Sequence, residues 1–177
     1  EVGKSIRLLE LFGFQGVKNL NQYYAVKQKK KFEDLNLISE KNEPSLEAYC
    51  PIILGISFLD QIKSIENFET IRFEKIAYPV IFLSFLSRAS EISGKKIYAK
   101  FDKNEILLNL NVNICSSFFN QEFPKLVDKV EIKFLTNQDN FTEIEWNSLY
   151  KLAENTFVEE SDSLKQGAAG AGLTDND

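Results

Sequence analysis

The pattern of apolar and polar positions predicts a strand, a helix and two further strands between Ile71 and Ile114. In the middle of this stretch, apolar residues recur at i, i+3, i+4 and i+7, which is typical of one face of a helix. Pro79 suits the first helical position, and Gly94 suits a left-handed stop. We therefore expect a helix from Pro79 to Ser93. Its first half is apolar on every side, so other elements should enclose it.

Alternation of apolar and polar residues predicts three strands after this helix. They are expected at Lys96 to Phe101, Glu105 to Ile114 and Val127 to Leu135. The tight segment between the first two is typical of an antiparallel hairpin. These elements predict an α+β fold, with an antiparallel or mixed sheet and flanking helices.

The region after the third strand carries a helix-start signal. Thr142 and Glu145 have the spacing of a capping box, and Phe141 can pack on Trp146 across the helix start. We expect a helix from Glu143 to Phe157. Its apolar stripe should lie on the sheet.

Near the start of the chain, the periodicity predicts one helix that ends at Gly13 and a shorter one from Val17 to Val26. Leu20 and Tyr24 should face inward in the second helix. The lysine-rich run Lys27 to Lys31 follows it. This run suits either an anion-binding patch or a solvated helix end, where cations complement the helix dipole.

The apolar segment Cys50 to Asp60 is expected to be a buried strand or a close-packed turn, because Pro51 and Gly55 weaken a helix interior. Cys50 and Cys115 form no disulfide framework, so we expect reduced thiols in a cytoplasmic protein. With no His or second Cys nearby to activate it, Cys50 is expected to be a core thiol rather than a nucleophile.

Length and composition predict one globular domain over residues 1–177, with a helical part over about 1–30 and a C-terminal helix and Gly/Ala tail over 142–177. The net charge of −5 argues against a nucleic-acid partner. No apolar run approaches the length of about 20 residues that spans a bilayer, so no membrane partner is expected. The absence of His excludes Ser-His-Asp and Cys-His catalysis and His-ligated zinc. No metal site and no cofactor are predicted.

The C-terminal tail is the most unusual stretch of the sequence. Six consecutive Gly and Ala residues precede an oxygen-rich cluster, and such clusters suit hard cations or acid–base chemistry. Alternatively, the tail packs across its own domain or a neighbouring subunit, with Arg88 or Arg72 as donors to its carboxylates. The candidate catalytic residues are Asp175 and Asp177, and the candidate binding residues are Thr174, Asn176 and Arg88.

Three runs resemble a bacterial family known only as a domain of unknown function (three-seven-two-six). They are Ala48 to Gly55, Pro79 to Ala89 and, above all, Gly170 to Asp177. The resemblance implies a bacterial, stand-alone protein, and members of that family normally begin with a helical segment that would lie upstream of Glu1. It carries over no catalytic residue.

Two hypotheses of function follow. The first is a non-catalytic binding or accessory protein whose sheet and tail form an interface with a partner or with a second copy of the chain. The second is a small carboxylate-based enzyme with the Thr-Asp-Asn-Asp cluster of the tail at its site. A tail inside a concave pocket would favour the enzyme, and a tail across a flat boundary would favour the binding protein.

Overall fold

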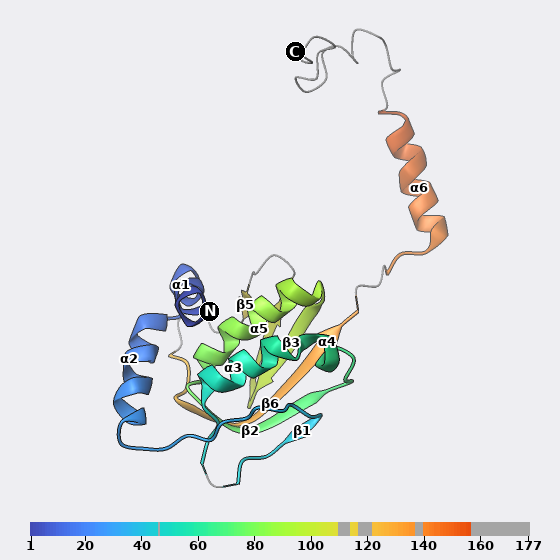
Figure 1. Ribbon diagram of the computed structural model, residues 1–177. Helices are drawn as coiled ribbons and strands as arrows, with labels where there is room; N and C mark the ends of the chain where they lie inside the picture. Colours follow the sequence, from blue (N-terminus) through green and yellow to red (C-terminus); the bar gives the residue numbers. More distant parts are fainter. Residues whose placement is uncertain (46, 110–113, 117–121, 137–139, 157–177) are drawn as a thin grey trace, which may run out of the picture. The chain divides into compact units, whose positions relative to one another are not determined.

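The computed structural model describes all residues except 46, 110–113, 117–121, 137–139 and 157–177 (Figure 1). The chain divides into two compact units, Glu1–Asn137 and Gln138–Asp177. The larger unit holds a mixed sheet and the helices that pack on it. These helices are α1 (Val2–Leu11), α2 (Gly16–Lys27), α3 (Pro51–Asp60), α4 (Ile62–Ile65) and α5 (Pro79–Ser93).

The sheet has six strands in the order β1-β2-β6-β3-β4-β5. Among the described strands, only the pairing of β1 with β2 is parallel, and the other neighbours are antiparallel. The predicted α+β class with a mixed sheet is confirmed. The strands are β1 (Lys41–Asn42), β2 (Ile71–Ala77), β3 (Lys96–Phe101), β4 (Asn104–Leu108), β5 (Ile114–Ser116) and β6 (Leu126–Leu135). The predicted strand Glu105 to Ile114 is thus divided between β4 and β5, and residues 110–113 lie outside the described part.

One face of the sheet is apolar and covered, and the other is polar. The cross-strand register places Arg72, Glu131, Lys100 and Glu105 in one row over four neighbouring strands. Arg72 Nε lies 3.3 Å from Glu131, and Lys100 Nζ lies 3.4 Å from Glu105. Charges therefore alternate along the row. Each exposed pair contributes only about 0–1 kcal/mol, but opposite charges face each other across the strands and the polar face is compatible with water.

Helix α5 lies across the covered face beside α3 (Figure 1). Its bounds and its first-position proline agree with the prediction, and Gly94 ends it with a φ of +69°. Three polar residues of this helix, Ser84, Ser87 and Ser90, are fully buried. The hydroxyls of Ser84 and Ser90 donate to backbone carbonyl oxygens at 2.7 and 2.8 Å, which offsets the cost of their burial.

The prediction of a strand or turn over Cys50 to Asp60 is wrong, because Pro51–Asp60 forms the helix α3. Pro51 occupies the first turn, where its missing N–H costs no helical hydrogen bond. Gly55 is required by packing. A Cβ at Gly55 would lie 2.3 Å from Cδ2 of Phe85 in α5, so only a residue without a side chain permits this approach.

Helices α1 and α2 form near their predicted positions, but the inward face of α2 differs from the prediction. Tyr23 is fully buried, whereas Tyr24 is 47% exposed. Leu20 packs against the core as expected. A step of one residue turns a helix by about 100°, so Tyr23 and Tyr24 cannot both face the core.

The smaller unit contains α6 (Glu143–Glu154). The predicted capping box is confirmed: Thr142 Oγ1 accepts from the Glu145 N–H, and the Glu145 carboxylate accepts from the Thr142 N–H at 2.7 Å. The rings of Phe141 and Trp146 stack at 5.2 Å between centroids, as expected for a hydrophobic staple. The predicted end at Phe157 lies outside the described residues, and packing of this helix on the sheet stays a prediction.

Gly55→Ala should lower the free energy of unfolding by about 1–3 kcal/mol, because the new methyl group overlaps the Phe85 ring. Urea denaturation measures this loss. Gly3→Ala in α1 is the matched control, since no atom lies within 4 Å of its added Cβ. That control should be neutral or stabilising because Ala favours helix. Equal losses in the two variants would contradict the close contact between α3 and α5.

Phe85→Ala should cost about 3–5 kcal/mol of unfolding free energy, because it leaves a large cavity beneath α3 in the core. Ile92→Ala on the same helix is the control. Ile92 is 46% exposed, so its truncation should cost well under half as much. A denaturation midpoint that does not move in Phe85→Ala would show that α5 is peripheral.

Candidate functional site

Two helices begin at adjacent positions in the larger unit. The Tyr49 N–H donates to the Lys75 carbonyl oxygen at 2.7 Å, and the Ala77 N–H donates to the Tyr49 carbonyl oxygen at 3.2 Å. Tyr49 therefore runs parallel to the end of β2. Each of these extended segments enters a helix whose first residue is proline, Pro51 in α3 and Pro79 in α5. The positive dipole ends of both helices consequently lie at the same end of the covered face.

The backbone of β2 and of the turn after it is strained. Lys75 and Tyr78 have φ values of 51° and 45°, in the left-handed region that disfavours residues with a Cβ. The Tyr78 N–H donates to the Lys125 carbonyl oxygen at 2.8 Å, which helps to hold this conformation. Such strain often accompanies functional sites, so this junction is a candidate site on structural grounds.

A buried thiol and a buried phenol meet at this junction. Cys50, the residue before α3, is 1% exposed, and its Sγ lies 3.0 Å from the hydroxyl oxygen of the fully buried Tyr23. The Tyr23 ring stacks on Phe32 and meets Tyr78 edge-on, at centroid distances of 5.4 and 5.9 Å. Burial raises the pKa of Tyr23 above its ordinary value, and the hydrogen bond to Cys50 is the second largest cause of the rise. The phenol therefore stays protonated to a higher pH than an ordinary tyrosine does.

The enclosure of Cys50 agrees with the prediction of a core thiol. Its contact with Tyr23 was missed, because the two residues are 27 positions apart and no motif links them. The apolar spacing of this helix is the only local indication that a tyrosine faces the core, and it predicts Tyr24 rather than Tyr23. In the observed geometry, Cys50 and Tyr23 form a buried hydrogen bond, and no further chemistry is assigned to the pair.

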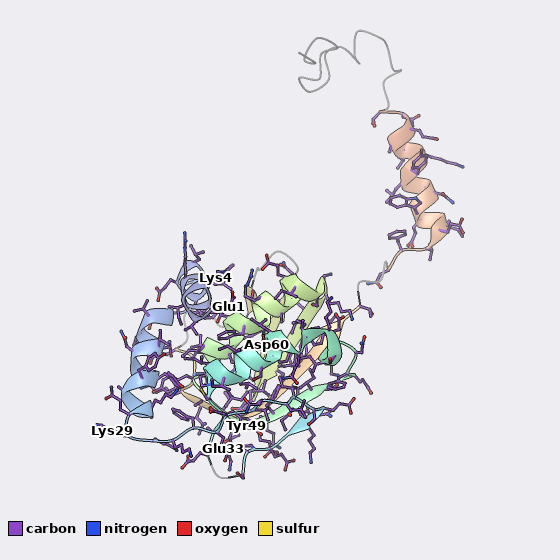
Figure 2. The ribbon with its side chains drawn as sticks, viewed as in Figure 1. Glu1, Lys4, Lys29, Glu33, Tyr49 and Asp60 are labelled. Atoms are coloured by element: carbon purple, nitrogen blue, oxygen red, sulfur yellow. The ribbon has the colours of Figure 1, made fainter. Side chains whose placement is uncertain are left out.

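A carboxylate positions the segment that leads into Cys50. The Glu33 side chain accepts from the Ser45 N–H at 3.0 Å, the Ser45 hydroxyl at 3.1 Å and the Glu47 N–H at 2.9 Å. The Glu33 carbonyl oxygen accepts from the Cys50 N–H at 2.8 Å. Glu33 and Tyr49 lie close together on this side of the unit (Figure 2). Glu33 thus acts as a structural clamp, and its carboxylate is occupied by protein donors.

The residues predicted for the tail site are not brought together in the described part of the chain. Arg88 pairs with Glu91 on the same helix, and its Nε is buried with no hydrogen-bond partner among the described residues. Arg72, the other candidate donor to the tail, pairs with Glu131. Among the described residues, no group of three or more His, Cys, Asp or Glu could hold a metal ion. The other predicted site residues, Thr174, Asp175, Asn176 and Asp177, lie outside the described residues.

The smaller unit carries an exposed apolar surface, which we call the α6 stripe. It consists of Trp146, Leu149, Tyr150 and Ala153, spaced i, i+3, i+4 and i+7. Trp146, Leu149 and Tyr150 are 52%, 64% and 49% exposed. Lys151 lies about 200° around the helix axis from Leu149 and hence on the opposite side. The helix is therefore amphipathic, and within the smaller unit its apolar side is exposed.

A family model described as "Protein of unknown function (DUF3726)" matches residues 1–47. The resemblance to a domain-of-unknown-function family is thereby confirmed. The match covers 47 of the 177 residues and lies upstream of all three runs that suggested the resemblance. Comparison with curated proteins and with solved structures gave no match. Across the described residues, no helix combines the length and apolar character needed to cross a membrane.

Tyr23→Phe should lower the free energy of unfolding by about 0.5–1.5 kcal/mol at pH 7, because it removes the hydrogen bond to Cys50. The pH dependence should change as well. The pKa of Tyr23 is higher in the folded protein than in the unfolded chain, so its contribution is present below about pH 10 and is lost as the pH rises above that value.

Urea denaturation between pH 8 and pH 11 checks this prediction. The unfolding free energy of the wild type should fall more steeply above about pH 10 than that of Tyr23→Phe. Tyr49 and Tyr98 also have raised pKa values but are present in both proteins, so their contributions cancel in the comparison. Parallel pH curves would contradict the inferred shift of Tyr23.

Proposed function

We propose that this chain is a non-catalytic binding or accessory protein, and that the α6 stripe is the interface through which it binds a partner protein or a second copy of itself. The observation that carries the proposal is the exposure of Trp146, Leu149 and Tyr150 on one side of a well-capped helix. Three large side chains on one face exceed the scattered apolar residues of an ordinary surface. Trp and Tyr are also the residue types that most often anchor interfaces.

Helix energetics support the proposal. A helix of 12 residues is marginal in water even with favourable ends, so its stability normally comes from packing. The capping box and the Phe141–Trp146 stack define where α6 begins, but they bury little of its stripe. Full burial of each large apolar side chain would contribute about 1.5–3 kcal/mol. Docking of the stripe into an apolar groove supplies that burial, with anchors at i, i+3, i+4 and i+7.

Site-specific crosslinking tests the proposal. A photoreactive benzophenone amino acid replaces Leu149 in the full chain, which is then irradiated in its native cells. The matched control places the same amino acid at Lys151, on the opposite side of α6. We expect crosslinks from position 149, to a second copy or to another protein, at least about fivefold above those from position 151. Position 149 is within contact distance of any occupant of the stripe, whereas position 151 is not.

Fluorescence of the purified protein gives a second measurement. Trp146 is the only tryptophan, so selectively excited tryptophan emission reports this helix alone. Addition of the crosslinked partner, or an increase in protein concentration for a second copy, should shift the emission to shorter wavelengths. The absence of crosslinks from position 149, or equal crosslinking from 151, would overturn the proposed interface.

A further inference from the structure

An acid-free, lysine-rich segment lies within an acidic protein. Between Leu11 and Phe32 the sequence holds five lysines and no Asp or Glu, although the whole chain has a net charge of −5. In the structure this segment forms α2 and the turn that follows it. The lysines of the turn lie at the C-terminal end of α2, where the helix dipole favours cations, but that effect is small and confined to the last turn.

Only part of this positive charge is neutralised within the described residues. Lys18 pairs with Glu122 at 2.6 Å, and Lys30 pairs with Glu47 at 2.7 Å. The Lys27 ammonium lies 5.6 Å from the centre of the Tyr23 ring. Lys29 and Lys31 are exposed and form no ion pair with the described residues. Figure 2 shows Lys29 at the end of α2, directed away from the body of the larger unit.

The same helix exposes apolar side chains at helical spacing. Val17, Leu20 and Tyr24 follow one another at i, i+3 and i+7. Val17 is 53% exposed and Tyr24 is 47% exposed, while Leu20 is partly buried against the core. Side chains at this spacing form a ridge of the kind that packs against another helix. We call this ridge, together with the lysines of the segment, the α2 surface.

We propose that the α2 surface binds an acidic amphipathic helix of another polypeptide. The apolar ridge matches the apolar stripe of such a helix, and the lysines match its acidic flanks. Nucleic acid fits less well, because the segment has no Arg and Val17 offers nothing to a phosphate. An anionic membrane also fits less well, since the exposed ridge is narrow and lacks the Trp and Phe side chains of interfacial helices.

Fluorescence anisotropy of a labelled peptide tests the proposal. Residues 140–156 of this chain supply a natural acidic amphipathic sequence, with three Glu and one Lys. This peptide is titrated with the full-length protein, and a scrambled peptide of the same composition is the control. We expect a Kd on the order of 10–100 µM for the native order, with clear weakening between 50 and 300 mM salt. The scrambled peptide should bind at least about tenfold more weakly.

Two variants of the protein locate the binding surface. Val17→Ser shortens the ridge, and Lys29→Glu reverses a charge that has no ion-pair partner among the described residues. Each should weaken peptide binding about fivefold while leaving the melting temperature unchanged, because both side chains are exposed. Lys103→Glu, in the turn between β3 and β4, makes the same charge change elsewhere and should bind like the wild type.

Several outcomes would overturn the proposal. The first is that the peptide fails to bind, and the second is that Val17→Ser and Lys29→Glu leave its affinity unchanged. The third such outcome is that Lys103→Glu weakens binding as much as the two test variants do. Vesicles with phosphatidylglycerol and a 20-base-pair DNA are tested in parallel, and binding to either one without binding to the peptide would also overturn it. The proposed binding surface lies within Glu1–Asn137. Failure of this proposal would therefore leave the proposed role of the α6 stripe intact.

Discussion

The contact between Gly55 and Phe85 determines how closely α3 and α5 approach each other, and much of the larger unit depends on that approach. The position that a Cβ would take at Gly55 is filled by the aromatic ring. The packing continues through Phe58 and Phe82, whose rings meet edge-on at 5.8 Å. Aromatic pairs of this geometry gain electrostatic energy in addition to burial. Helix α5, which packs against the sheet, α3 and α1, has no water-facing side in its first half.

This approach also determines where the helices begin. Because α3 and α5 lie side by side, the turns before Pro51 and Pro79 are brought together at one end of the covered face. Tyr78 is held there in a conformation that costs free energy, and the buried Cys50 and Tyr23 share a hydrogen bond beside it. The surrounding core must offset that strain. A loss of packing at Gly55 should therefore also destabilise the strained backbone and the hydrogen bond at the candidate junction.

Charge and exposure differ among the surfaces of the molecule. On the polar face of the sheet, Arg72, Glu131, Lys100 and Glu105 compensate one another within the unit. The α2 surface leaves Lys29 and Lys31 without an ion pair among the described residues, and the α6 stripe exposes large apolar side chains within its own unit. These two surfaces are proposed as binding surfaces for that reason, and the sheet face is interpreted as solvated.

The sequence by itself determined the elements whose signals are local. The bounds of α5 were predictable from Pro79, Gly94 and the spacing between them, and the start of α6 was predictable from its capping box. Strands β3 and β6 followed from alternation. These signals act over a few residues, so they need no knowledge of the remainder of the chain. The candidate residues of the tail had no comparable test, because they lie outside the described residues.

Only the tertiary structure decided the features that depend on partners distant in sequence. By local propensity Gly55 weakens a helix, yet it lies within α3. The ring of Phe85, 30 positions later, packs where a Cβ at Gly55 would be, so the glycine is favoured by packing. Tyr23 rather than Tyr24 is buried in the core, where its hydroxyl contacts Cys50. Local propensities differ by about 1 kcal/mol or less per residue, whereas burial of a large side chain contributes about 1.5–3 kcal/mol. Packing therefore prevailed wherever the two disagreed.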